Sequence, residues 1–426
     1  MHDVIVIGAG FAGCAAAREV RRAGKTPLII EARDRIGGRT WTADWDGRIY
    51  ERGGNFFHWF QPHAWTEIMA AGCTPMVLPT PVRASRLVGG EVHAADVDEH
   101  DAIIESAWAK YNADSWRILP LPHDPLSPLN DITRLDGMTI AERIAELDLT
   151  PDEHGVLMGE CEGLASGYAD DAGALSVLRW HALCGHNLLS TQQASGGDIA
   201  IAEGTIGFLQ PILDEAACDV ALETPIAAIE QDGDRVVVTT RSGEAIVGRT
   251  AVVTIPLNVL GDIAFEPGFS EAKQAGIAQG HAGIGSKAMF KVRGLDETVV
   301  ALAEDHPFGW FTTLFDDGDE QTLVAFGRDG ADVRDDLEWA QHEIGRVFPE
   351  ATVVELSYHD WKADEFAQGT WAIHRPGWYA NHHAAMQEPE GRVILASADI
   401  ADGWAGFVDG ALESGKRGGR WAAAQV

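Results

Sequence analysis

Apolar residues near the start of the chain follow two different periods. Four consecutive apolar residues, Val4 to Ile7, predict a strand buried on both faces. The alanine-rich segment from Ala12 to about Ala23 ends at Gly24, which predicts a helix. A second apolar run, Pro27 to Ile30, predicts another buried strand. The chain is therefore predicted to open with a βαβ unit, as in proteins with a parallel sheet.

Further along the chain the pattern changes more than once. Between about residues 100 and 200 the apolar spacing is helical, as in Ile140–Leu147. After Glu203 short strands return, and residues from about 277 to 364 mix strands with a helix. The strands predicted after Glu203 are Val220–Leu222, Ile226–Ile229, Arg235–Thr240, Glu244–Val247 and Ala251–Pro256. With 426 residues, the chain is long enough for an α/β protein of two domains.

Three glycines occupy the first turn between strand and helix. Gly8, Gly10 and Gly13 form G-x-G-x-x-G, in which missing Cβ atoms let a pyrophosphate approach the N–H groups of the helix N-terminus. Glu31 follows the second strand, where an acid accepts hydrogen bonds from ribose hydroxyls. An acid there disfavours a 2′-phosphate. The unit is therefore predicted to bind FAD or NAD rather than NADP.

The residues that follow carry a resemblance to a known family. The stretch Glu31–Thr40, with the letters EARDRIGGRT, resembles the FAD-fingerprint extension of the flavin amine oxidase superfamily. The segment Glu51–Asn55, with the letters ERGGN, looks like the second glycine pair of this family beside the flavin. The resemblance implies FAD as cofactor and these further contacts with it: Arg33, Gly38, Arg39, Gly53, Gly54 and Asn55.

The same resemblance implies a two-domain FAD-dependent amine oxidase fold of the α/β class. A Rossmann-like FAD-binding domain is expected from residues 1–79, 203–276 and 365–426. A mixed α+β substrate-binding domain is expected from residues 80–202 and 277–364. The cofactor domain is thus expected to be built from separated pieces of chain.

One lysine and two tryptophans are expected near the flavin. Lys287 resembles the family lysine that holds a water against flavin N5; the alternative, a solvent-facing strand lysine, suits Lys291 better. Trp361 resembles a flavin-contacting tryptophan and Trp371 one wall of an aromatic cage, with core packing as the alternative for both. Thr370 stands where monoamine oxidases carry a cysteine bonded to FAD. Since a hydroxyl cannot form that thioether, FAD is expected to bind non-covalently.

The C-terminal segment resembles the last motif of the family. Asp399 takes the position of an acid that binds the ribityl or pyrophosphate region of FAD. Gly406, Phe407 and Val408 begin a helix whose N-terminal amides are expected to face flavin O2, where the helix dipole stabilises negative charge. Phe407 takes the second cage position, where a tyrosine is usual, so Lys287, Trp371 and Phe407 are the expected catalytic residues. Two further tryptophans are expected to line the substrate site: Trp404 and Trp180.

The net charge limits which binding partners are expected, and the cysteines bear on disulfides and metal sites. A formal net charge of −33 repels phosphate groups, so neither nucleic acid nor an anionic membrane is expected to bind. It suits a cationic amine or a basic redox protein, although a solubility surface is the favoured explanation of this charge. Five cysteines without C-x-x-C spacing predict neither a disulfide framework nor a metal site. A cytoplasmic protein is expected, and a homodimer is one candidate for its assembly.

The expected function is oxidation of a small amine. In this reaction a hydride passes to flavin N5, the imine or iminium product hydrolyses to a carbonyl compound, and O₂ becomes H₂O₂. His58–His63 looks like the same segment of bacterial amine oxidases of nicotine, pseudooxynicotine and alicyclic amines. The alternatives are an amine dehydrogenase with a cytochrome-type acceptor, a desaturase or porphyrinogen-type oxidase, and a non-catalytic FAD-binding protein. Oxidation of L-amino acids is less expected, because only Arg375 is a remote candidate to pair with a carboxylate.

Overall fold

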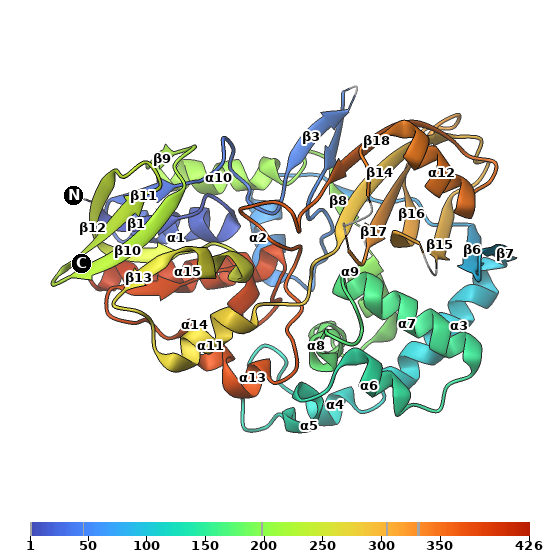
Figure 1. Cartoon of the computed structure of the whole chain (residues 1–426), viewed down its shortest axis with the longest axis horizontal. Coiled ribbons are helices and arrows are strands. Elements are labelled where there is room, and N and C mark those ends of the chain that lie inside the picture. The colour runs from blue at the N-terminus through green and yellow to red at the C-terminus, as the bar shows by residue number, and fades with distance from the viewer. Residues whose placement is uncertain (1, 46, 197–198, 304–305, 330–332) are drawn as a thin grey trace.

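A computed structural model describes residues 2–45, 47–196, 199–303, 306–329 and 333–426. Two large sheets lie at opposite ends of the molecule, and both termini lie beside the first sheet (Figure 1). The first has eight strands in the order β13-β10-β11-β12-β1-β2-β9, with β19 also paired to β12. Their bounds are β13 Ala264–Glu266, β10 Ile226–Asp232, β11 Arg235–Thr240, β12 Ala245–Val253, β1 His2–Ile7, β2 Pro27–Ile30, β9 Asp219–Ala221 and β19 Val393–Leu395.

The centre of the first sheet is parallel and buried. β1 pairs in parallel with both β2 and β12, and Val4, Ile5 and Val6 have no exposed surface. Helix α1 (Phe11–Arg22) packs on α10 (Ile206–Ala216) and on the C-terminal helix α15 (Val408–Ala424), with α2 (Pro62–Ala70) beside α15. The α1–α15 contact is very close, since a Cβ on Gly415 would lie 2.2 Å from the carbonyl oxygen of Ala12. The predicted βαβ unit is therefore present.

One strand differs from the sequence expectation. Glu244–Val247 and Ala251–Pro256 were expected as separate strands, yet β12 runs continuously through Ala245–Val253. Its first half pairs antiparallel with β11 and its second half parallel with β1, and Gly248 pairs with both neighbours. The polar residues after Gly248 interrupt the apolar run without interrupting the ladder. The apolar pattern therefore breaks where β12 changes its pairing partner, although the strand itself continues.

The second sheet has seven strands in the order β18-β14-β17-β16-β15-β6-β7. Their bounds are β18 Thr352–His359, β14 Ser286–Arg293, β17 Gln321–Gly327, β16 Phe308–Asp316, β15 Val299–Ala303, β6 Arg83–Val88 and β7 Glu91–Ala95, with α12 Leu337–Val347 packed on β18. β14 lies between β17 and β18, so its residues face other protein on both edges.

A group of helices lies below the second sheet in the view of Figure 1. They are α3 Val97–Tyr111, α4 Ser115–Ile118, α5 Thr133–Asp136, α6 Ile140–Ala145, α7 Pro151–Ala165, α8 Ala174–Leu183 and α9 Leu188–Gly196. The helical spacing between residues 100 and 200 is thus confirmed. α7 begins with a capping box between Thr150 and Glu153 and contacts β15 and β16.

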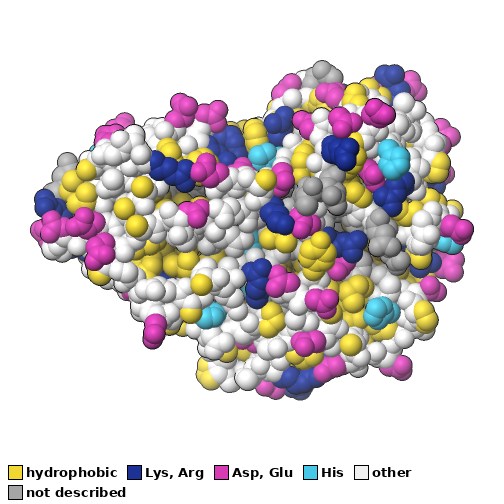
Figure 2. Space-filling view, in the orientation of Figure 1, with side chains coloured by type: hydrophobic (Ala, Val, Ile, Leu, Met, Phe, Trp, Pro, Cys, Tyr) yellow, Lys and Arg dark blue, Asp and Glu magenta, His cyan; other side chains and the backbone are white. Residues whose placement is uncertain are grey.

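Short elements connect these parts. Two small antiparallel sheets pair β3 (Thr42–Trp45) with β4 (Arg48–Glu51) and β5 (Pro75–Val77) with the distant β8 (Ile199–Ile201). The other α-helices of the described ranges are α11 Glu271–Gln279, α13 Trp378–Asn381 and α14 His383–Gln387. On the face shown in Figure 2, acidic and basic side chains are interspersed over both ends of the molecule. No helix within the described ranges is long and apolar enough to cross a membrane.

Candidate active site

A cavity of about 710 Å³ connects the two sheets. It begins at the carboxyl ends of β1 and β2, where Gly8 and Glu31 line it, and passes Lys287 of β14. It continues between the second sheet and helices α3, α7 and α9, where side chains such as Ile104, Trp310 and Phe326 make it largely apolar. The carboxyl edge of parallel strands is where such sheets bind ligands.

The glycine turn forms a cradle at the first end of the cavity. Gly10 is the N-cap of α1, and a Cβ added to Gly38 would lie 3.5 Å from the Cα of Gly10. The two backbone segments therefore face each other closely across the cradle, and Gly38 also has a positive φ of 61° that favours glycine. Gly8 and Gly54 also line the cavity, whereas Gly13 does not. A Cβ on Gly13 would lie 1.9 Å from the carbonyl oxygen of Gly8, so Gly13 lets the turn close.

Backbone amides fix the orientation of the Glu31 carboxylate. It accepts hydrogen bonds from the N–H groups of Ala9 at 2.7 Å and Arg33 at 2.8 Å while it lines the cavity. Arg33 in turn makes a bidentate pair with Asp364 at 2.7 and 2.9 Å. Burial would raise the pKa of Asp364, but hydrogen bonds from His359 and Arg33 outweigh it and hold that pKa below its usual range. Two acids thus keep fixed positions beside the glycine cradle.

The Asp399 carboxylate does not line the cavity but lies behind Arg39. Its carboxylate is fully buried, pairs with Arg39 at 2.5 Å and accepts the Leu257 N–H at 2.8 Å. Arg39 lines the cavity, and it also donates to the carbonyl oxygen of Thr370 at 2.7 Å. The expectation of a direct cofactor contact from Asp399 is therefore corrected, because Arg39 stands between the acid and the cavity. Asp399 orients Arg39.

Lys287 is buried, so the solvent-facing alternative is wrong for it. Its Nζ donates to the carbonyl oxygens of Glu51 at 2.7 Å and Gly53 at 2.8 Å and to Oδ1 of Asn55 at 2.8 Å. Burial lowers the pKa of Lys287 to about 7, and the nearby Glu51 carboxylate opposes that shift. An ammonium has three N–H donors, and all of them are used here. Holding a water against the flavin would require Lys287 to release one of these acceptors.

Glu51 belongs to the recognised glycine motif, yet no role was predicted for it. Its carboxylate accepts hydrogen bonds from Thr42, from the Trp41 N–H at 3.1 Å, and from the N–H and hydroxyl of Thr205 at 2.7 and 3.0 Å. Burial nevertheless raises the pKa of Glu51. The residue holds three segments of chain around Lys287. No periodic pattern marks it, because its partners come from a turn near residue 205.

Aromatic side chains line the second end of the cavity. Trp371 donates its indole N–H to the Leu164 carbonyl at 2.8 Å and meets the Phe326 ring edge-on. Phe407 lines the same cavity and packs edge-on against Trp180, another lining residue, with ring centroids 5.2 Å apart. Both cage candidates therefore border one space. Trp361 lines it too, with its indole N–H donated to the Arg52 carbonyl at 3.2 Å.

Trp404 and Arg375 lie outside the cavity. Trp404 is 1% exposed, packs edge-on behind Phe407 at 5.0 Å and donates its indole N–H to the Phe60 carbonyl. It therefore supports Phe407 and does not line the substrate site as expected. Arg375 pairs bidentately with Asp171 at 2.8 Å, so it is not placed to bind a substrate carboxylate.

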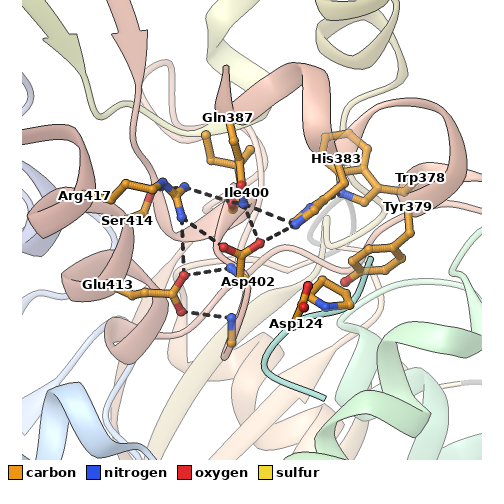
Figure 3. Close-up of polar contacts among 12 residues, drawn as sticks. Asp124, Trp378, Tyr379, His383, Gln387, Ile400, Asp402, Glu413, Ser414 and Arg417 are labelled. Carbon is orange, nitrogen blue, oxygen red and sulfur yellow. Dashed lines mark hydrogen bonds and ion pairs between the residues drawn. The ribbon is translucent and has the colours of Figure 1, made fainter. Parts of the chain in front are cut away.

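Polar side chains clamp the loop that precedes Phe407. Glu413 accepts the N–H groups of Asp402 and Gly403 at 2.9 Å each, and Arg179 donates to the carbonyl oxygens of both residues. Figure 3 shows further side chains converging on the Asp402 carboxylate: His383, Gln387 and Arg417. Since α15 begins directly after this loop, the clamp fixes the start of the helix and with it the ring of Phe407.

These residues fit FAD. The glycine cradle, the α1 N-terminus and Glu31 suit a dinucleotide, and Val408 and Gly406 bring the N-terminus of α15 to the same cavity. None of the five cysteines, all of which lie in described parts of the chain, lines the cavity. Thr370 lines it at the expected position. No group of three potential metal ligands was found within the described residues.

The chain belongs to the flavin-containing amine oxidoreductase family, whose model matches residues 11–420. It is an FAD-dependent oxidoreductase that acts on amines. The family expected from the sequence motifs is confirmed.

Named relatives cover nearly the whole chain. Pseudooxynicotine dehydrogenase of a Pseudomonas species is 34% identical over 98% of this chain and 85% of its own. Nicotine dehydrogenase of Pseudomonas putida is 32% identical over 98% of this chain and 88% of its own. The solved structure of cyclohexylamine oxidase from Brevibacterium oxydans matches with a TM-score of 0.79 at 22% identity, covering 99% of each chain. This last likeness supports the expected two-domain α/β fold.

Proposed function

We propose that this protein oxidises a small amine to an imine or iminium ion, which water then converts to a carbonyl compound, with O₂ as the electron acceptor. The observation that carries this proposal is the single cavity that joins the glycine cradle to Trp371 and Phe407, with Lys287 beside the passage. FAD bound in the cradle supplies the acceptor for a hydride from the carbon next to the amine nitrogen.

The side chains of this protein then have separate tasks. Trp371 and Phe407 offer aromatic faces to the amine, which attract its partial or full positive charge. The apolar lining around them disfavours the ammonium form and so favours the neutral amine that can lose a hydride. When protonated, Lys287 places positive charge beside the cavity, where negative charge accumulates during the reaction. The N-terminus of α15 adds a second electropositive group.

A protein acceptor is the second candidate. Two relatives above 30% identity carry the word dehydrogenase in their names, whereas (S)-6-hydroxynicotine oxidase of Paenarthrobacter nicotinovorans is 29% identical. A basic cytochrome would suit the net charge of −33. The sites needed for amine oxidation are the same in both cases.

Two measurements test these proposals in sequence. A panel of primary, secondary and alicyclic amines is added anaerobically to the purified holoenzyme, and flavin bleaching is followed by absorbance. Bleaching by at least one amine is expected, and bleaching by none contradicts amine oxidation. The reduced enzyme is then mixed with O₂ in a stopped-flow instrument. Rapid recovery of colour with one H₂O₂ per turnover is expected for an oxidase, and slow recovery favours the protein acceptor.

A further inference from the structure

One acidic side chain in the wall of the reaction cavity has no bonding partner. Glu160 lies on α7 and lines the cavity. Within the described parts of the chain, no donor or cation bonds to its carboxylate. Its neighbours on the same helix differ in this respect, since Glu153 pairs with Lys110 at 2.7 Å and Glu162 with Arg328 at 2.7 Å. Glu160 is therefore the acid of this helix that is left for a ligand.

The surroundings of Glu160 disfavour an isolated negative charge. The elements that α7 contacts, α3, β15 and β16, contribute apolar side chains to the same cavity: Ile104, Trp108, Val300 and Trp310. Burial raises the pKa of Glu160 to about 7, and the negative charge of Asp101 on α3 adds to that effect. A carboxylate in such a position gains much more from a cation than one that is already paired or well hydrated.

Glu160 lies on the same helix as the residue that holds Trp371 at the aromatic end of the cavity. It precedes Leu164 by four residues, and the Leu164 carbonyl accepts the Trp371 indole N–H at 2.8 Å. Four residues of α-helix rise about 6 Å along the axis. The Glu160 carboxylate and the aromatic walls thus border the same cavity, with about one turn of α7 between Glu160 and the residue that holds Trp371.

We propose that Glu160 binds a second basic nitrogen of the substrate, remote from the nitrogen that is oxidised, and that this protein therefore prefers diamines. The proposal rests on amine oxidation in the cavity and adds its substrate class. The second nitrogen arrives as an ammonium and forms a charge-assisted hydrogen bond with Glu160. The first nitrogen then lies toward Trp371, and the chain between the two contacts the apolar wall.

The test compares matched amines on the holoenzyme. Diaminobutane, diaminohexane and diaminooctane, with nitrogens at both ends, are compared with butylamine, hexylamine and octylamine, each also in N-methylated form. Anaerobic flavin reduction gives the apparent second-order rate constant for each amine. Glu160→Gln removes the charge and keeps the shape. Glu105→Gln is the matched control, because Glu105 also lines the cavity but is exposed to solvent.

We expect the wild-type protein to prefer one diamine over its matched monoamine by at least about 10-fold. Glu160→Gln should lower the rate constant for that diamine about 10- to 100-fold, as the loss of a charge-assisted hydrogen bond predicts. The monoamines should change less than about three-fold, and Glu105→Gln should leave the preference intact.

Three results would overturn the proposal. The wild-type protein shows no preference for diamines, Glu160→Gln slows both classes equally, or Glu105→Gln has the same effect as Glu160→Gln. Rapid reduction by monoamines without a diamine preference refutes the Glu160 site while leaving amine oxidation in place. Reduction by no amine refutes both.

Discussion

Replacing Lys287 with methionine removes a buried positive charge and three hydrogen bonds but keeps most of the side-chain volume. The acceptors that lose their donor are the carbonyl oxygens of Glu51 and Gly53 and the side chain of Asn55. We expect the Lys287→Met protein to fold, to remain yellow and to turn over slowly. The slowing follows because a positive charge is lost beside the cavity in which electrons accumulate. Removal of one preorganised electrostatic group typically slows chemistry by about 10²- to 10³-fold.

The effect on stability depends on pH with a defined sign. Burial lowers the pKa of Lys287 from 10.5 to about 7, a difference of about 3.5 units. At roughly 1.4 kcal/mol per unit, the folded state disfavours the protonated lysine by about 5 kcal/mol. The unfolded chain binds more protons between about pH 7 and 10.5, so wild-type stability rises with pH across this window. Methionine removes this dependence, while each unsatisfied acceptor costs about 1–3 kcal/mol.

The variant should therefore fall further behind the wild-type protein as pH rises, by up to about 4 kcal/mol between about pH 7 and 10. Denaturant unfolding of both holoenzymes at saturating FAD measures this difference. Stopped-flow absorbance measures flavin reduction and reoxidation separately. Lys291→Met is the matched control, since Lys291 lies on the same strand but is half-buried and pairs with Glu355 at 3.2 Å. A stability gap that stays constant with pH, together with half-reactions within a few-fold of wild type, would refute the assigned role.

Three further predictions concern the cofactor and the clamp before Phe407. Glu31→Ala should weaken FAD binding by about 1.5–3 kcal/mol, because the ribose hydroxyls lose a charged acceptor, and titration of the apoprotein with FAD measures this. An unchanged affinity counts against the position of Glu31. Acid precipitation should release FAD intact, because Thr370 cannot form a thioether; flavin that stays in the pellet contradicts this. Glu413→Gln should lower stability by about 1–2 kcal/mol and raise KM more than it lowers kcat, because one of the Asp402 and Gly403 N–H groups loses its acceptor. Equal changes in both constants speak against positioning through Phe407.

The cofactor end of the molecule was predictable because its signals are local. Val4–Ile7, the glycine turn and Glu31 follow one another within a single βαβ unit, and each has a fixed structural meaning there. The strand prediction was wrong at Gly248, because the signal there is not local. Its cause is a change of pairing partner, which depends on strands far away in the sequence. Local patterns therefore identified the unit but not every strand that completes the sheet.

Most residues named from motif resemblance line the cavity, both at backbone turns and as aromatic side chains such as Trp371 and Phe407. Gly10, Gly38, Arg39 and Lys287 line it, and each belongs to a turn or strand end that the motif defines. Trp404 was expected to line it as well, yet its side chain turns behind Phe407 toward the Phe60 carbonyl. The direction of a side chain in an irregular loop depends on contacts with other segments. A motif that fixes the backbone position does not fix that direction.

The substrate end of the cavity could not be predicted in the same way, because its residues belong to no common sequence motif. Glu153, Glu160 and Glu162 are all acids on one helix, and they differ in the partners that other segments bring to them. Lys110 reaches the first and Arg328 the third, and both cations come from distant parts of the chain. The absence of a similar partner for Glu160 within the described residues is a property of the folded cavity. The diamine preference proposed for Glu160 therefore rests on contacts between distant segments, which no local sequence motif encodes.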